Sequence, residues 1–349
     1  MSDNIPIKNI YYMLSYAFQI LNQDCYKNLS GESFKNLADM FAAILQKGIE
    51  NQVKKYLNRE YIIEKNTMTA LRGKIEVSDS INQLTFLNKQ LVCSYDEFSI
   101  DSYMNRILKS TVLCLIKTDI SKERKLRLKY LLGYFGSIKE LDLYHINWNL
   151  QYNKNNQTYR MLMGICYLFV KGLLQTESNG KLKLMDFLDE QRMCRLYEKF
   201  ILEYYKKEYK ELSVNSSEIQ WQLNDNNDYM LPVMQSDIML SKNNRILIID
   251  AKYYSHSTQV QYEKHTVHSA NLYQIFTYVK NKEAELSEED HEVAGMLLYA
   301  KNYDNHLPAN DYMMSGNRIS VRTLDLNCDF IDIKKQLDII CNSYFSVSD

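Results

Sequence analysis

One short segment near residue 240 constrains the fold of this chain more than any other. Residues 236–240 (Ser-Asp-Ile-Met-Leu) are followed by Ser-Lys-Asn-Asn-Arg and then by residues 246–252 (Ile-Leu-Ile-Ile-Asp-Ala-Lys). The middle residues favour a turn, so the two flanking runs are predicted to pair as an antiparallel hairpin. The aliphatic run 246–249 is typical of a central strand that is buried on both faces. The hairpin therefore predicts a sheet that lies between helices.

Charged residues stand at the end of this predicted central strand. Asp250 and Lys252 are two residues apart and so lie on the same side of the strand, and Asp237 begins the partner strand. Uncompensated charges there cost on the order of several kcal/mol, and a divalent metal would compensate them. The two aspartates and the backbone carbonyl of Ala251 are hard oxygen ligands suited to Mg²⁺. Lys252 is then placed to orient or activate an attacking water and to offset transition-state charge.

This arrangement is the Asp-x(n)-(Asp/Glu)-x-Lys pattern of the PD-(D/E)xK nucleases, with Ala251 as the variable residue. Ser236 stands where that pattern often has proline. The spacing alone is weak evidence, because chance matches are common in a chain rich in Asp and Lys. The alternative interpretation is a strand end whose Asp and Lys face solvent or pair with each other.

Residues on two flanking helices extend the pattern. Glu198 lies at the edge of the apolar stripe of a helix predicted at 191–212, where the nuclease core often supplies a further metal-binding carboxylate. Gln274 and Tyr278 are four residues apart and share a helix face, which resembles the accessory motif of RecB-like nucleases. The alternatives are a solvated Glu198 paired with a lysine, and a Tyr278 that belongs to the core.

Periodicity divides the chain into two halves at the polar residues 153–157. We expect an N-terminal domain at 1–155 that mixes helices with a β-rich projection at about 60–100, and a C-terminal α/β domain at 156–349. In the first half the pattern predicts helices at 7–21, 34–57, 102–117 and 122–134, with strand-like stretches at 61–77 and 87–98. In the second half it predicts helices at 191–212, 269–282 and 330–344 and strands at 219–223, 234–240, 246–251, 293–299 and 319–326. This order places one mixed sheet between helices.

The charge of the chain limits its functions. It has 42 Lys and Arg against 43 Asp and Glu, a net charge of −1, which argues against coating nucleic acid by bulk electrostatics. A local basic groove, or a partner that carries the DNA, stays open. The sequence has no GxxxxGK[ST] loop, so we expect any nucleotide hydrolysis to belong to another chain.

The spacing of the cysteines indicates a reducing cytoplasm, and the apolar runs argue against a membrane span. The seven cysteines lie far apart without a CxxC pair, unlike a disulfide framework or a zinc or iron–sulfur site. The longest apolar stretch, 161–174, is shorter than the roughly 20 residues of a bilayer span, and the N-terminus does not resemble a signal peptide.

Several short runs, spread over the chain in family order, resemble the McrC family of nuclease subunits from McrBC modification-dependent restriction systems. They are residues 9–17 (NIYYMLSYA), 73–76 (GKIE), 105–109 (NRILK), 249–254 (IDAKYY) and 271–274 (NLYQ). The resemblance implies a C-terminal PD-(D/E)xK endonuclease domain in which Asp237, Asp250 and Lys252 are catalytic, with Mg²⁺ as the cofactor. None of these three residues departs from the nuclease pattern.

The resemblance also implies a partner. McrC binds a hexameric AAA+ GTPase, McrB, whose separate domain recognises methylated cytosine in double-stranded DNA. The N-terminal half of McrC docks on that ring and stimulates GTP hydrolysis, and a McrC–McrC contact in the assembled complex is a further expectation. We place the stimulating element on the β-rich projection, with Arg72 and Lys74 beside a glycine at a loop tip as candidate contacts to nucleotide phosphates. The alternative is that both are solvated loop cations.

Two other functions are alternatives to a nuclease subunit. One is a scaffold that activates the GTPase without cutting DNA, which the complete Asp-Asp-Lys set disfavours. The other is a stand-alone RecB-like repair nuclease, which has no need of the McrC-like N-terminal half.

Overall fold

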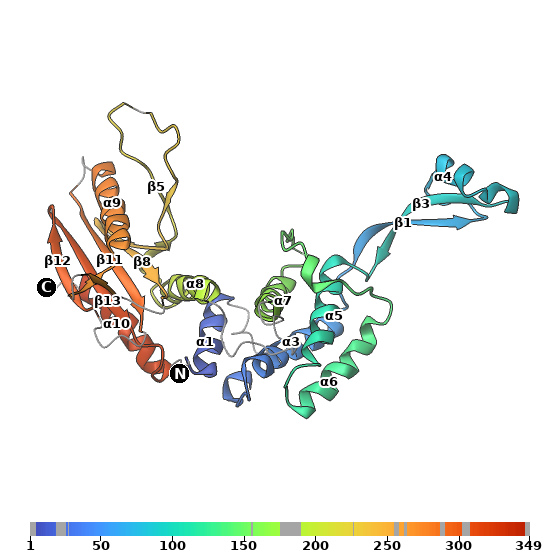
Figure 1. Cartoon of the computed structure of the whole chain (residues 1–349), viewed down its shortest axis with the longest axis horizontal. Helices are drawn as coiled ribbons and strands as arrows, with labels where there is room; N and C mark the ends of the chain where they lie inside the picture. Colours follow the sequence, from blue (N-terminus) through green and yellow to red (C-terminus); the bar gives the residue numbers. More distant parts are fainter. Residues whose placement is uncertain are drawn as a thin grey trace. The chain divides into compact units, whose positions relative to one another are not determined.

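The computed structural model describes residues 5–18, 26, 28–154, 156–174, 190–225, 227–254, 258–261, 264–286, 290–301 and 308–345. The chain forms two compact units (Figure 1). The first, called here the sheet unit, comprises Met1–Phe34 and Phe187–Asp349, and the second, the helical unit, comprises Lys35–Asp186. The helical unit is therefore an insertion in the sheet unit.

These boundaries differ from the single division expected at residue 155. The polar residues 153–157 do not separate compact units, because helix α7 (Tyr159–Leu174), which follows them, packs on α3 (Leu37–Lys54) and α5 (Tyr103–Leu115) of the same unit. The assignment of docking and cutting to separate parts of the chain stays a prediction.

The sheet unit is built on one mixed sheet with six strands in the order β12–β13–β11–β8–β7–β4. β11 runs parallel to β8 and β13, and the other pairs are antiparallel. The strands are β4 (Ser213–Asn215), β7 (Ile238–Lys242), β8 (Arg245–Lys252), β11 (Glu292–Ala300), β12 (Asn310–Met314) and β13 (Asn317–Leu324). The predicted mixed sheet and the β7–β8 hairpin are thus confirmed.

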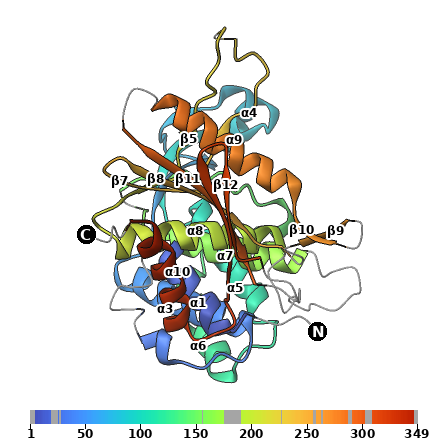
Figure 2. The ribbon, with the colours of Figure 1, turned by 90° about the vertical axis from the view of Figure 1, so that its left-hand side faces the viewer.

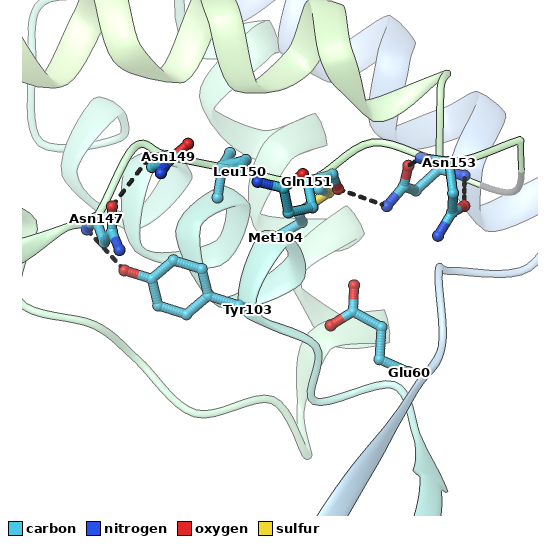
Figure 3. A pocket seen from close by; sticks show the side chains of 9 residues that line it. Glu60, Tyr103, Met104, Asn147, Asn149, Leu150, Gln151 and Asn153 are labelled. Atoms are coloured by element: carbon cyan, nitrogen blue, oxygen red, sulfur yellow. Dashed lines mark hydrogen bonds between the residues drawn. The ribbon is translucent and has the colours of Figure 1, made fainter.

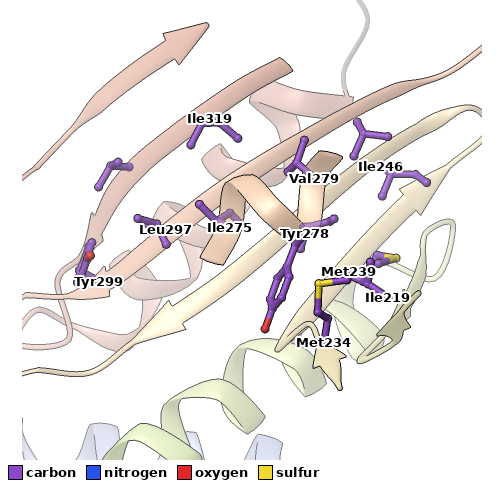
Figure 4. Packing of buried hydrophobic residues seen from close by; sticks show 13 residues of the cluster. Ile219, Met234, Met239, Ile246, Ile275, Tyr278, Val279, Leu297, Tyr299 and Ile319 are labelled. Atoms are coloured by element: carbon purple, nitrogen blue, oxygen red, sulfur yellow. The ribbon is translucent and has the colours of Figure 1, made fainter. Parts of the chain in front are cut away.

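Helices cover both faces of this sheet (Figure 2). On one face lies α9 (Ser269–Glu285), and on the other lie α8 (Glu190–Glu208) and α10 (Phe330–Phe345). Ile246 and Ile248 of β8 share a buried cluster with Ile275 and Val279 of α9 (Figure 4). Because side chains alternate along a strand, Asp250 and Lys252 also lie on the α9 face.

A glycine allows α9 to approach the sheet closely. A Cβ atom on Gly295 of β11 would lie 2.8 Å from side-chain atoms of Ile275 and Val279. On the opposite face, the hydroxyl of Tyr205 donates to the carbonyl of Leu337 at 2.9 Å, which joins α8 to α10.

The N-terminal helix α1 (Ile7–Ala17) belongs to the sheet unit and not with residues 35–155 as expected. Its apolar face packs on α8, where Tyr16 donates to Glu208 at 2.6 Å. Buried Asn9 donates from Nδ2 to the carbonyls of Leu326 and Cys328 at 2.9 and 2.8 Å. These long-range contacts explain why α1 joins a unit that is far away in the sequence.

The helical unit combines the packed helices α3, α5, α6 (Lys122–Leu132) and α7 with a small sheet of order β1–β3–β2. The helices expected at 34–57, 102–117 and 122–134 are confirmed with shorter bounds; the helix expected at 7–21 is confirmed at 7–17, and its residues 19–21 lie outside the described residues. The β-rich projection is present as β1 (Glu60–Met68), β2 (Lys74–Ile75) and β3 (Leu91–Ser99), so the stretch expected at 61–77 forms strand in two pieces only. Neither the short helix α4 (Val77–Asn82) nor α7 was predicted. No helix among the described residues combines the length and the apolar character needed to cross a membrane.

The remaining elements are short. Of the expected strand 219–223, only β5 (Glu218–Ile219) forms; it pairs with β6 (Met234–Gln235). β9 (Thr258–Gln261) and β10 (Lys264–Val267) form a separate two-stranded sheet, and the 3₁₀ turns are Asn28–Gly31, Thr85–Asn88, Gly133–Phe135 and Leu143–His145.

Candidate active site

The candidate site begins where β7 leaves its partner strand. β7 begins at Ile238, which pairs with Ile249 of β8, and the residue two positions before it, Ser236, bonds to Ser217. There the backbone N–H of Ser236 donates to the carbonyl of Ser217 at 3.0 Å, and the Ser236 hydroxyl donates to the same carbonyl at 3.1 Å. This double attachment fixes the residue that follows, Asp237.

The side chain of Asp237, and not its backbone, bonds to the backbone of the neighbouring strand β8. Its Oδ2 accepts a hydrogen bond from the backbone N–H of Ala251 at 2.9 Å. This bond holds the Asp237 carboxylate beside Asp250, so the carboxylates of the two hairpin strands meet at one end of the sheet, as the sequence predicted.

Lys252 is the third residue of this cluster, beside Asp237 and Asp250. Its Nζ lies 2.9 Å from Oδ2 of Asp250 and donates to Oε1 of Gln274 on α9 at 3.3 Å. The side chains of Lys252 and Asp250 are only 13% and 2% exposed. The alternative of a solvent-facing Asp and Lys is therefore wrong, although the two do pair with each other.

The charges of this cluster do not balance. Burial raises the pKa of Asp250 to about 7; the ammonium of Lys252 opposes this rise and the carboxylate of Asp237 adds to it. Burial also raises the pKa of Asp237. Burial lowers the pKa of Lys252, but the ion pair with Asp250 outweighs it and holds that pKa well above its usual value. Two carboxylates thus face one ammonium, and a proton or a further cation is needed for neutrality.

The cluster has donor atoms that suit a hard cation. Oδ2 of Asp250 is fully buried, and the Nζ of Lys252 at 2.9 Å is the positive charge that faces it. Among the described residues, however, no three His, Cys, Asp or Glu side chains gather closely enough to hold a metal by themselves. A cation here would therefore depend on the two aspartates, with a backbone carbonyl such as that of Ala251 and water as further ligands.

Glu198 lies on α8, which packs on β8. Burial raises the pKa of its carboxyl; the thiol of Cys194 lowers it, and Asp237 raises it further. Glu198 is therefore within electrostatic reach of the cluster without being one of its closest members. Cys194, whose Sγ donates to Oε1 of Glu198 at 3.0 Å, was not predicted as a site residue. Its position four residues before Glu198 was the available signal.

The α9 motif is arranged as the helical spacing predicted. Nε2 of Gln274 donates to the hydroxyl of Tyr278 at 2.8 Å, while Oε1 of Gln274 receives the bond from Lys252. Tyr278 is also part of the buried cluster of Figure 4, so it is a core residue as well as a hydrogen-bond partner of Gln274.

Arg72 and Lys74 lie in the helical unit on either side of Gly73, which has a φ of +67°. The Arg72 guanidinium lies 3.9 Å from the ring centre of Tyr95 and 2.5 Å from Glu97. Lys74 is 78% exposed, with its Nζ 3.7 Å from Glu76. Lys74 is the first residue of β2 and lies opposite Ser94 of β3, and Arg72 is held beside β3 by its two contacts. The role of both cations stays a prediction.

The helical unit also contains a cavity of about 590 Å³ (Figure 3). Its lining includes Glu60, Tyr103 and several amide side chains, some of which already bond within the loop. None of the predicted catalytic residues lines this cavity.

Comparisons with known proteins agree with the resemblance seen in the sequence. A family described as "McrBC 5-methylcytosine restriction system component" matches residues 3–300. The "Type IV methyl-directed restriction enzyme EcoKMcrBC" of Escherichia coli (strain K12) is 28% identical over 349 residues, which cover 97% of this chain and 98% of that protein.

Two solved structures are similar. A chain of the half-complex from the tetradecameric assembly of Thermococcus gammatolerans McrB AAA+ hexamers with bound McrC has a TM-score of 0.53 and 18% identity, covering 97% of this chain and 76% of its own length. At this identity the likeness concerns the fold alone. A chain of the Thermococcus gammatolerans McrBC complex has a TM-score of 0.42 and 21% identity, over 58% of each chain.

Proposed function

Because this chain belongs to the family of McrBC 5-methylcytosine restriction system components, we propose that it is the nuclease subunit of such a system. It acts with an McrB-like AAA+ GTPase hexamer and hydrolyses phosphodiester bonds of double-stranded DNA that carries modified cytosine. The observation that carries the proposal is the meeting of Asp237, Asp250 and Lys252 at one end of the sheet, with two carboxylates against one ammonium.

The chain's own residues suggest how the reaction proceeds. Asp237 and Asp250, with the carbonyl of Ala251, would hold Mg²⁺, and the outlying Glu198 would act through water. The ion supplies a Lewis acid and a bound water of lowered pKa. Because its pKa is raised, Lys252 stays protonated at neutral pH and does not take up a proton. Its role is to orient the attacking water and to stabilise negative charge on the phosphate, and Gln274 fixes its Nζ for this role.

Reconstitution tests this proposal directly. The full chain is mixed with its partner GTPase, GTP, Mg²⁺ and DNA with or without methylated cytosine, and the products are separated by size. We expect double-strand cutting that requires all components and that EDTA stops. Stimulated GTP hydrolysis without any cutting would favour the scaffold function, and cutting without the GTPase would favour a stand-alone nuclease.

The effect of Mg²⁺ on stability is expected to depend on pH. The pKa of Asp250 is raised from 3.8 to about 7, so stability from its protonated form is lost as the pH rises through this interval. Mg²⁺ binds the ionised carboxylate and competes with that proton. Mg²⁺ should therefore raise the melting temperature more at pH 8 than at pH 6. Asp250→Asn is the control and should remove most of this difference; an equal Mg²⁺ effect at both pH values would contradict the assignment.

Stimulation of the partner is proposed to involve Arg72 and Lys74. A cation near the nucleotide phosphates neutralises charge that develops during hydrolysis, and the stacking on Tyr95 holds the Arg72 guanidinium in place. We expect the double substitution Arg72→Ala/Lys74→Ala to lower the stimulated GTP hydrolysis rate at least about tenfold. Lys65→Ala, which removes a cation paired with Asp79 from the same small sheet, is the matched control. Unchanged stimulation by the double variant would remove this idea.

A further inference from the structure

The thiol of Cys194 contacts both the end of β8 and the carboxylate of Glu198. Cys194 and Glu198 lie four residues apart on α8 and so share a face of that helix. The Cys194 Sγ donates to Oε1 of Glu198 at 3.0 Å. The same sulfur interacts with the backbone N–H of Tyr253, the residue that follows Lys252. Cys194 therefore stands between β8 and the carboxylate of Glu198.

Glu198 needs such a contact to stay near the site. Its carboxylate is partly buried and is repelled by Asp237, while Lys252 and Arg195 attract it. A flexible side chain in this situation lowers its energy by turning toward water unless a donor holds it. A thiol donates a hydrogen bond without adding a charge to the cluster, so it holds the carboxylate while leaving the local excess of negative charge unchanged.

We propose that Cys194 is a positioning residue that holds the Glu198 carboxylate toward Asp237. In that position Glu198 adds to the field that attracts a divalent cation and accepts a hydrogen bond from water bound to that cation. This inference rests on the proposed function, because it concerns the same cation site. It assigns a role to a residue that neither the nuclease pattern nor the McrC-like runs include.

Three substitutions separate this role from simple packing. Cys194→Ser keeps a donor and an acceptor, Cys194→Ala removes both, and Cys194→Val fills the volume without either. Binding of Mn²⁺ to the full chain, without DNA or partner, is measured by calorimetry. We expect the Ala and Val variants to bind Mn²⁺ about tenfold more weakly, as for other residues that orient metal ligands, and the Ser variant to stay within about threefold of the unsubstituted chain.

A double-mutant cycle shows whether Cys194 acts through Glu198. In the background of Glu198→Gln, Cys194→Ala should cause little further loss of Mn²⁺ affinity. Cys341→Ala is the control, since it removes a different thiol of the sheet unit, on α10, and it should leave Mn²⁺ affinity unchanged. The melting temperature of each variant shows whether it is folded.

The outcomes distinguish the two proposals. If the unsubstituted chain binds no Mn²⁺ and cuts no DNA, the proposed function itself fails. If it binds Mn²⁺ and a folded Cys194→Ala or Cys194→Val variant binds it equally well, only the positioning role is overturned. The same conclusion follows if the loss caused by Cys194→Ala persists in full in the Glu198→Gln background.

Discussion

Replacing Asp250 with Ala is expected to abolish DNA cutting, with a loss on the order of 10³-fold or more. Asp250 supplies a fully buried carboxylate oxygen, and it is the ion-pair partner of Lys252. Its removal would take away a proposed ligand of the cation and the carboxylate that pairs with the ammonium of Lys252. Binding of the GTPase partner and stimulation of GTP hydrolysis should be retained, because we assign those functions to the helical unit.

The measurement is the rate of cleavage of methylated DNA by the reconstituted complex, with GTP hydrolysis followed in the same sample. Retained GTP hydrolysis shows that the variant is folded and bound. Asp311→Ala is a suitable control, because Asp311 pairs with Arg322 on neighbouring strands at the edge of the same sheet. Residual Mg²⁺-dependent cutting by the Asp250→Ala variant would show that the site has been assigned to the wrong residues.

The sequence predicted those parts of the site that depend on local pattern. A turn between two short runs identified the β7–β8 hairpin, and the alternation of side chains placed Asp250 and Lys252 on one face. Helical spacing predicted that Gln274 and Tyr278 lie together, and the structure joins them by a hydrogen bond. Each of these inferences required only the residues of one or two adjacent elements.

Features that depend on distant segments were missed. Helix α1 packs on α8 through contacts between residues far apart in the sequence, such as the bond from Asn9 to the carbonyl of Leu326. No local pattern encodes such contacts, so the sequence did not predict that the helical unit is an insertion in the sheet unit. The short strands β4 and β12 lie at the edges of the sheet, where the pairing partner decides whether a strand forms. Cys194 was missed because its spacing of four residues from Glu198 indicates a shared helix face but does not show that its thiol donates to that carboxylate.

Substituting Met for Lys252 is expected to separate cation binding from the chemical step. Met has a similar length and no charge, so the two carboxylates would lose the ammonium that now balances one of them. Their attraction for a divalent cation should therefore be unchanged or stronger. Cutting should nevertheless fall by about 10²- to 10³-fold, since the transition state would lose a charged group that stabilises it.

This combination of effects distinguishes Lys252 from Asp250, whose removal should weaken both cation binding and cutting. Mn²⁺ affinity from calorimetry and single-turnover cleavage rates provide the two measurements, and Lys252→Arg tests whether charge alone suffices. The longer, planar guanidinium keeps the charge but does not reproduce the position of Nζ between Asp250 and Gln274. We therefore expect Lys252→Arg to recover only part of the cutting rate. If Lys252→Met lost Mn²⁺ binding as fully as Asp250→Ala, Lys252 would instead be a structural partner of the carboxylates.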